Sequence, residues 1–211
     1  MLQNQIIQTY SKIHTPISYT NDTNISFEGS QIQREFFTAW DCISNHFKQN
    51  PVDNLTFLEV GAWKGLWGIA FAEFCRLNSI KGKYVTLTLI DQDINNQDLF
   101  NSSEYIKSLG LESVIINENT LSDSALDLII EHESKFNIVF IDADHGYHSV
   151  MSDISKFAPL ATDLLIFHDI RPKEVHANCG VYQAIVDSNI TLDEEITTNE
   201  QLMGIGIKYI K

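Results

Sequence analysis

Four acidic residues, each at or just after the end of an apolar run, are the first candidates for chemistry in this sequence. They are Glu59, Asp91, Asp142 and Asp169. Acids are common in turns and caps, but the carboxyl ends of the strands in an open parallel sheet form the crevice where ligands bind. Four acids at that edge predict a shared site. Asp91, at the end of the strand that follows a glycine turn, is placed to hold ribose hydroxyls.

The glycine turn lies between residues 57 and 68, where an apolar run passes through Glu59 to Gly61 and Gly65 and then into a second apolar segment. This pattern predicts a buried strand that turns sharply into a helix. A glycine there permits positive φ or close approach of a ligand, and the helix N-terminus offers free N–H groups to an anion. The spacing is not the Gly-x-Gly-x-x-Gly of dinucleotide sites. A plain turn, with Glu59 facing water, is the alternative.

Strands must alternate with helices to bring these residues together. Apolar runs predict strands at residues 55–60, 84–90, 113–117, 136–141 and 164–167. Helices are predicted at 64–77, 97–109 and 124–132, and another carries Val150, Ile154 and Phe157 on one side. This alternation is typical of a parallel sheet covered by helices on both faces.

The two ends of the chain complete the prediction. Helices are expected at 3–11, at 31–48 behind Ser30 as N-cap, and at 181–188, and strands at 190–196 and 203–210. The fold class is therefore α/β, a Rossmann-like doubly wound sheet, mostly parallel with an antiparallel C-terminal strand. Residues 1–30 are interpreted as an N-terminal arm and residues 31–211 as a single domain.

Composition excludes several function classes. The formal net charge is −14 over 211 residues, which repels phosphate backbones and anionic membranes and argues against a nucleic-acid partner. No apolar run reaches the length of a membrane span, and the N-terminus lacks the pattern of a signal peptide. The three cysteines, Cys42, Cys75 and Cys179, are odd in number and widely spaced. This favours reduced thiols and a cytoplasmic setting.

With these motifs in order, the chain resembles a class I S-adenosylmethionine-dependent methyltransferase of the small-molecule O-methyltransferase branch, which includes catechol-type and sugar- or antibiotic-tailoring enzymes. The resemblance covers residues 54–170. It rests on four segments: Leu58-Glu59-Val60-Gly61 with Gly65, Ile90-Asp91, Phe140-Ile141-Asp142-Ala143-Asp144-His145-Gly146-Tyr147, and Phe167-His168-Asp169-Ile170. Each segment alone is weakly specific, and the four together are fairly specific.

The resemblance implies a role for each matched position. Glu59, Gly61 and Gly65 match the turn that holds the methionine end of the cofactor, and Asp91 matches the acid that binds the ribose. Asn119 lies where the adenine is usually met, followed by Thr120. Trp63 either packs on the cofactor or fills the core, and we favour the cofactor. Asp142, which matches a metal-binding carboxylate, is also expected beside the cofactor.

The same resemblance implies a catalytic group and a metal. Asp142 and Asp169 match carboxylates that bind a divalent cation, and His145 lies where the family often has a lysine as general base. Such a cation, Mg²⁺ or Mn²⁺, would lower the pKa of an acceptor hydroxyl, and a histidine could take its proton near neutral pH. Surface or structural roles are the alternative for His145.

Several positions depart from the family pattern. Ile170 replaces an Asn metal ligand, so either His168 or a nearby acid is the substitute ligand, or no metal is bound; ligation by His168 would favour Mn²⁺ or Fe²⁺ over Mg²⁺. Trp67 replaces a serine that contacts the cofactor, and Thr162-Asp163 replaces a Gly-Gly pair. These departures leave the metal open.

The resulting hypothesis is methyl transfer to a hydroxyl of a small molecule or sugar. Another α/β enzyme, or a catalytically silent methyltransferase-like module or partner subunit, remains the alternative. The acceptor is not specified by any motif, although Lys173, His176 and Asn178 lie in the loop where it would bind. The N-terminal arm either covers the acceptor site or mediates a homodimer.

Overall fold

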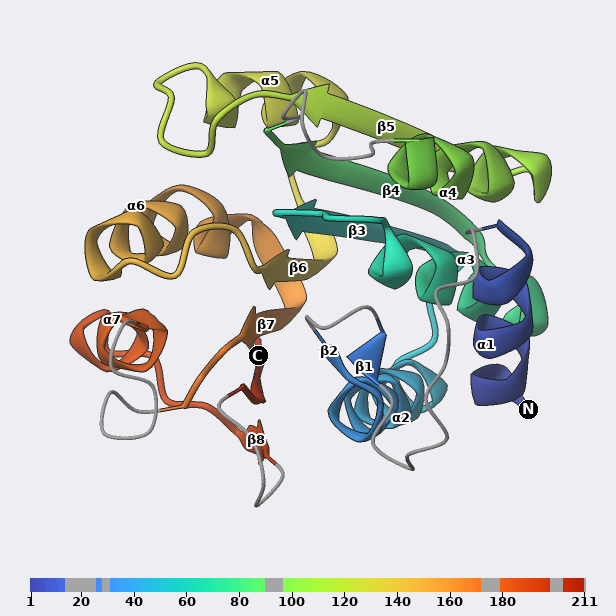
Figure 1. Cartoon of the computed structure of the whole chain (residues 1–211), viewed down its shortest axis with the longest axis horizontal. Coiled ribbons are helices and arrows are strands. Elements are labelled where there is room, and N and C mark those ends of the chain that lie inside the picture. The colour runs from blue at the N-terminus through green and yellow to red at the C-terminus, as the bar shows by residue number, and fades with distance from the viewer. Residues whose placement is uncertain (14–25, 28–30, 90–96, 172–178, 198–202, 211) are drawn as a thin grey trace.

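A seven-stranded sheet forms the centre of the computed structural model, which describes residues 1–13, 26–27, 31–89, 97–171, 179–197 and 203–210 (Figure 1). Its strands are β3 (Asn54–Val60), β4 (Lys81–Thr88), β5 (Glu112–Asn117), β6 (Phe136–Ile141), β7 (Ala161–His168), β8 (Glu194–Ile196) and β9 (Ile205–Tyr209). Their order is β5-β4-β3-β6-β7-β9-β8, and β9 alone runs antiparallel to its neighbours within this described sheet. The predicted doubly wound α/β fold is confirmed.

Helices cover both faces of the sheet, which lies between them in Figure 1. One face carries α1 (Leu2–Ile13), α2 (Gln33–Gln49), α3 (Leu66–Asn78) and α4 (Gln97–Ser108), and the other carries α5 (Ala125–His132), α6 (Tyr147–Phe157) and α7 (Val181–Asp187). A short 3₁₀ turn, η1 (Ala158–Leu160), leads into β7. The inner strands are buried on both faces, which explains why they appear as continuous apolar runs. Every described helix is too short or too polar to cross a membrane.

Several elements differ from the prediction in their bounds; β4 and β7, for example, each begin three residues earlier than expected, at Lys81 and Ala161. Two other differences have a clear physical reason. The helix expected from residue 31 begins at Gln33, because Gln31–Ile32 forms β2, which pairs with β1 (Ser26–Phe27). Ser30, its predicted N-cap, lies outside the described residues. The strand expected at 190–196 is only Glu194–Ile196. Asn189 has φ 56° and ends α7, and the Ile190 N–H donates back to the Ile185 carbonyl. The chain therefore turns before pairing begins.

A buried carboxylate of α3 binds the N-terminal helix α1 to the domain. Glu73 of α3 accepts hydrogen bonds from the Thr9 hydroxyl of α1 at 2.6 Å and the Tyr105 hydroxyl of α4 at 2.5 Å. Arg76 completes the group with an ion pair at 2.7 Å. Because a buried carboxylate is costly unless it is paired, these contacts fix three helices together. They hold α3, whose N-terminus borders the site described next.

Candidate active site

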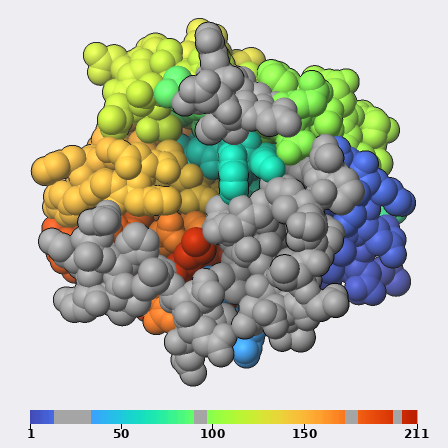
Figure 2. All heavy atoms as spheres, in the orientation of Figure 1, coloured from blue at the N-terminus to red at the C-terminus, as the bar shows by residue number. Residues whose placement is uncertain are grey.

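A cavity of about 390 Å³ opens at the carboxyl ends of four neighbouring strands. It is lined by Gly61, Ala62 and Trp63 after β3, Thr88 and Leu89 at β4, Asn119, Thr120 and Leu121 after β5, and Asp142, Ala143 and Asp144 after β6. Figure 2 shows one face of the molecule, and the teal segment of β3 and α3 reaches the surface near the centre of that view. The volume falls within the range of small-molecule sites. Gly61, Trp63, Asn119 and Asp142, all predicted from the sequence to bind a cofactor, thus meet around one space.

Gly61 is required by its surroundings. Its φ is 91°, and a Cβ there would lie 2.2 Å from the carbonyl oxygen of Asp142. The Gly61 N–H donates to Leu87 at 2.8 Å, and the Asp142 N–H donates to Val60 at 2.8 Å. Any side chain at this position would therefore separate β3 from the end of β6 and fill the cavity mouth.

Gly65 shapes the same turn without lining the cavity. It precedes α3 with φ 78°, and a Cβ would approach the Ser102 Cβ to 2.8 Å. Positive φ is costly for residues with a Cβ. Gly65 therefore lets α3 start close to α4, and its predicted cofactor contact stays a prediction.

The cavity walls carry unusually exposed apolar side chains. Trp63 is 44% exposed, Leu89 61% and Leu121 47%. Large apolar groups left in water around one hollow are typical of a ligand site. The Asn119 side chain accepts from the Leu121 N–H at 2.9 Å and so shapes the turn that presents Leu121. This wall suits a flat ring system with polar edges.

Glu59 lies behind the cavity wall. Its carboxyl group is 3% exposed and accepts a hydrogen bond from the Tyr84 hydroxyl of β4. Burial, with a smaller contribution from the Asp142 charge, raises the pKa of Glu59 to about 8. Glu59 is absent from the cavity lining, so this structure shows no direct path from its carboxyl group to a ligand. Asp91, predicted to hold the ribose, lies outside the described residues.

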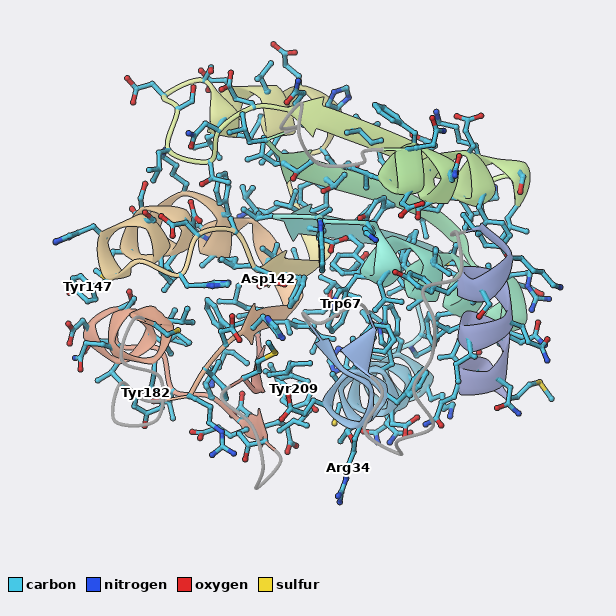
Figure 3. All side chains as sticks on the ribbon, viewed as in Figure 1. Arg34, Trp67, Asp142, Tyr147, Tyr182 and Tyr209 are labelled. Carbon is cyan, nitrogen blue, oxygen red and sulfur yellow. The ribbon has the colours of Figure 1, made fainter. Side chains whose placement is uncertain are left out.

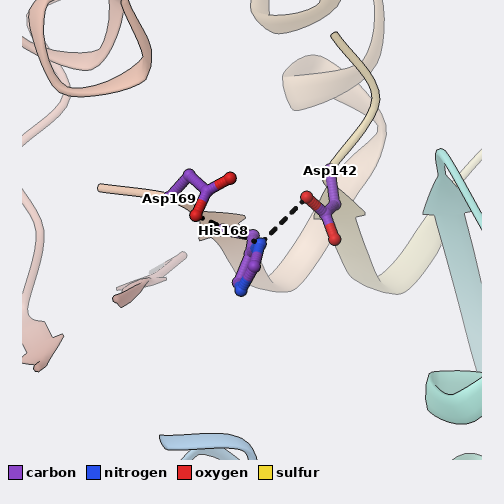
Figure 4. A group of neighbouring side chains, drawn as sticks. All are labelled: Asp142, His168 and Asp169. Atoms are coloured by element: carbon purple, nitrogen blue, oxygen red, sulfur yellow. Dashed lines mark hydrogen bonds and ion pairs between the residues drawn. The ribbon is translucent and has the colours of Figure 1, made fainter. Parts of the chain in front are cut away.

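An acid–histidine cluster adjoins the cavity. Asp142 follows β6, His168 ends β7, and Asp169 comes next with φ 56°, a strained conformation for a residue with a side chain. The His168 Nδ1 lies 3.1 Å from an Asp142 carboxylate oxygen and 3.6 Å from one of Asp169 (Figure 4). The His145 Nε2 lies 3.1 Å from the second Asp169 oxygen and 3.5 Å from Asp142. Figure 3 places Asp142 near the middle of the molecule at the sheet edge.

The charges in this cluster stabilise one another. Burial alone would lower the pKa of His168, but the Asp142 and Asp169 carboxylates outweigh it and raise that pKa to about 9. Burial would likewise raise the pKa of Asp142, but His168 and His145 hold it below its ordinary value. The hydrogen bond to Asp142 raises the pKa of His145 above 6.5. His168 is therefore an imidazolium at neutral pH, set between two carboxylates.

The same residues can hold a divalent cation. One ligand atom from each of Asp142, His168 and Asp169 lies within 4.8 Å of the others. The Nε2 of His168 and Oδ1 of Asp169 are buried and make no hydrogen bond within the described part of the chain. Two oxygens and one imidazole nitrogen fit Mn²⁺ or Fe²⁺ better than Mg²⁺. To ligate through either ring nitrogen, His168 would have to release a proton, because the imidazolium carries one on each.

The family departures contribute no ligand atom to this centre. Ile170 is buried and contributes no ligand atom. Trp67 is buried in the core, where its ring centroid lies 4.2 Å from that of Phe140, whereas Trp63 is exposed. Thr162 lies at the start of β7, at the opposite end of the strand from His168. Lys173, His176 and Asn178 lie outside the described residues.

Sequence reasoning missed part of the cavity wall. Leu89, Leu121 and Ala143 were assigned no role because an apolar residue after a strand carries no signal of its own. Thr88 was also missed; its hydroxyl donates to the Ala62 carbonyl at 3.1 Å and braces the glycine turn. The useful signal would have been position: each of these residues follows, or ends, a strand whose end was already assigned to the site.

Solved structures of similar fold include several methyltransferases. MycE methyltransferase from the mycinamycin biosynthetic pathway, in complex with Mg, SAH and mycinamycin VI, superposes with a TM-score of 0.57 at 15% identity, over 98% of this chain and 55% of MycE. The O-methyltransferase NovP gives 0.55 at 12% identity, over 84% and 80%. CalS11, a TDP-rhamnose 3'-O-methyltransferase of calicheamicin biosynthesis, gives 0.55 at 12% identity, over 97% and 92%. The chain thus spans about half the length of MycE. At these identities the likeness shows the fold.

The family itself follows from the sequence match. Among curated proteins no relative matches this chain. The model of the methyltransferase domain matches residues 58–170, more than half of the 211 residues. That span runs from β3 to the residue after Asp169, so it includes the glycine turn, the cavity walls and the acid–histidine cluster. The family resemblance found in the sequence is confirmed: this chain belongs to the methyltransferase domain family.

Proposed function

We propose that this protein transfers a methyl group from S-adenosylmethionine to a hydroxyl group of a small molecule, with a sugar as the favoured acceptor class. One observation carries the proposal: Asp142 both lines the cavity and belongs to the acid–histidine cluster. A methyl donor in the cavity would therefore lie next to groups that can bind and deprotonate a hydroxyl. Two of the similar structures support this choice: MycE, in complex with Mg and SAH, and CalS11, a TDP-rhamnose 3'-O-methyltransferase.

The cavity suits the parts of the donor in a definite order. Leu89 and Leu121, with the polar edge of Asn119, would take the adenine. Asp91 keeps its proposed role at the ribose, from its position in the sequence. The turn at Gly61 and Trp63 would take the methionine end, whose sulfonium would then lie beside Asp142. Methyl transfer requires the acceptor oxygen in line with the sulfonium methyl, at contact distance.

His145 is proposed as the general base. Its side chain is 43% exposed, whereas His168 is 4% exposed, so His145 can reach an incoming acceptor. Its Nε2 lies 3.1 Å from Asp169, which would orient the ring and stabilise it once it has taken the proton. Because the pKa of His145 is raised, the neutral base becomes more abundant as pH rises. We expect turnover to increase from neutral to mildly alkaline pH.

A divalent cation is part of the proposal. Asp142, His168 and Asp169 would hold it, and when bound it would lower the pKa of the acceptor hydroxyl. The chain's own contribution is independent of the ion: Asp142 and Asp169 fix both histidine rings, and Asp142 links the cluster to the cavity. Mn²⁺ is expected to support activity better than Mg²⁺.

The departures that suggested a catalytically silent module do not favour that alternative. Trp67 is buried in the core and leaves the cavity open. Ile170 removes one ligand at most, and three other donors remain together.

Calorimetry with S-adenosylmethionine and with S-adenosylhomocysteine tests the donor. We expect binding by the parent protein and by Asp169→Asn, and methyl transfer to nucleotide-linked sugars by the parent only. Titrations with Mn²⁺ and Mg²⁺ then test the ion. If the protein binds neither S-adenosylmethionine nor S-adenosylhomocysteine, the proposal is refuted. If it binds them with the same affinity with and without Mn²⁺ or Mg²⁺, only the proposed metal is refuted.

A further inference from the structure

Two of the walls that line the cavity follow β5 and β6, the outer two of the four neighbouring strands at this edge. One is the loop after β5, with Asn119, Thr120 and Leu121, and the other is the turn after β6, with Asp142, Ala143 and Asp144. The second wall continues directly into α6, which begins at Tyr147. The distance between the walls decides whether a flat ring fits between them. A contact that joins the loop after β5 to α6 would therefore set that distance.

Lys156 of α6 makes such a contact. Its ammonium nitrogen donates to the Thr120 carbonyl at 2.9 Å and to the Ser122 carbonyl at 3.1 Å. These two acceptors lie on either side of Leu121, the exposed apolar side chain of the loop. Hydrogen bonds with a charged donor are stronger than those between neutral groups. The contact thus fixes the loop backbone on both sides of Leu121, whose side chain lines the cavity.

The surroundings of Lys156 strengthen this contact. Asp153 is fully buried one turn earlier on α6, below Thr120. Burial raises the pKa of Asp153 to about 6, although the Thr120 hydroxyl and the Lys156 ammonium both favour its charged form. A carboxylate in this place attracts the ammonium group and limits its movement. Within the loop itself, the Ser122 N–H donates to the Asn119 carbonyl at 3.0 Å, which closes a compact turn.

We propose that Lys156 is a positioning residue for the methyl donor: by tying the Thr120–Ser122 backbone to α6, it sets the width of the slot that receives the adenine ring. The inference deepens the proposed function and rests on it. Lys156 touches neither the proposed acceptor nor the reacting atoms. Its loss should therefore weaken donor binding and leave the chemical step nearly unchanged.

The test compares three variants with the parent protein. Lys156→Met removes the charged donor and keeps most of the side-chain length, whereas Lys156→Arg keeps a charged donor. Lys135→Met is the matched control, because the Lys135 ammonium also donates to a backbone carbonyl, that of Pro159 at 2.7 Å, but precedes β6 at the end of the strand away from the cavity. Each is measured for its dissociation constant for S-adenosylhomocysteine, its KM for S-adenosylmethionine, its kcat and its thermal midpoint.

We expect Lys156→Met to bind S-adenosylhomocysteine about tenfold more weakly, which corresponds to one charged contact. KM should rise by a similar factor while kcat at saturation stays within about twofold of the parent. Lys156→Arg should recover most of the affinity, and Lys135→Met should bind like the parent.

Three results would overturn the inference. The first is unchanged affinity in Lys156→Met, and the second is a loss confined to kcat. The third is a loss of affinity in both Lys156→Met and Lys135→Met that follows the loss of thermal stability in each variant. If the parent binds no S-adenosylhomocysteine, the proposed function has failed first, and that result differs from all three. If Lys156→Met is too unstable to assay, the affinity of Lys156→Arg decides: near-parental affinity supports the inference, and affinity as poor as that of a cavity variant such as Gly61→Ala contradicts it.

Discussion

Replacing Glu59 by glutamine should change how the stability of this protein depends on pH. The folded carboxyl has a pKa of about 8, raised from 4.5 by burial. Between these values the native state holds a proton that the unfolded chain has released. The contribution of Glu59 to the free energy of unfolding is therefore fully present below pH 4.5 and is lost as pH rises through 8. The limiting slope is about 1.4 kcal/mol per pH unit, or about 2 kcal/mol between pH 6 and 7.5.

Glutamine removes the titration and keeps the hydrogen bond. Its side-chain carbonyl can still accept from the Tyr84 hydroxyl, which donates to Glu59 in the parent. Urea unfolding at several pH values between 5 and 8 gives the free energy of unfolding of both proteins. All other titrating groups are shared, so the difference between the two curves reports position 59. We expect Glu59→Gln to gain relative to the parent as pH rises.

Glu112→Gln is the matched control, because the side chain of Glu112 is 72% exposed at the start of β5. It should leave the slope unchanged. Parallel curves for the parent and Glu59→Gln would refute the buried, protonated state of Glu59. Donor binding adds a second readout: a carboxyl behind the cavity wall predicts similar affinity in both proteins, whereas direct contact with the cofactor, as the family resemblance implies, predicts a clear loss in Glu59→Gln.

Three further substitutions test other parts of the structure. Asp169→Asn should keep S-adenosylhomocysteine binding within about threefold by calorimetry and lower kcat by about 10²-fold or more, because it weakens the orientation of His145; equal turnover would contradict the role. Gly61→Ala should lose donor binding and about 2 kcal/mol or more in urea unfolding, since its Cβ would lie 2.2 Å from the Asp142 carbonyl oxygen. Glu73→Ala should cost about 3 kcal/mol in urea unfolding by unpairing Thr9 and Tyr105, with donor affinity retained; a loss under about 1 kcal/mol would show that α1 is held by its apolar face alone.

Sequence reasoning succeeded where one physical rule dominates. The strand at Phe136–Ile141 matches its prediction residue for residue, because a strand buried on both faces is mostly apolar along its length. The convergence of Asp142 and Asp169 followed from topology, since the ends of neighbouring parallel strands share one edge. Neither inference needed knowledge of side-chain packing.

It failed where partners distant in the sequence decide the outcome. The direction of the Glu59 side chain depends on the hydroxyl of Tyr84 from the next strand, which no local pattern reveals. The hold of α1 on the domain depends on Glu73, 64 residues after Thr9. Leu89 and Leu121 become cavity walls only because the fold leaves them exposed, and an exposed leucine is ordinary in any sequence.

The placement of Asp142 explains why the donor side of the site can be inferred and the acceptor side cannot. Val60 and Ile141 pair directly in the sheet, and the backbone of the next residue in each strand, Gly61 and Asp142, is in contact. The Asp142 side chain meanwhile pairs with His168 from the following strand. The cavity and the acid–histidine cluster are therefore fixed relative to each other by hydrogen-bonded strands, which tolerate little movement. An acceptor must approach this rigid edge through connecting loops, whose sequences vary freely without disturbing it. The proposed reaction can thus be inferred from strand ends, whereas the identity of the proposed acceptor would depend on loop residues that the strands do not constrain.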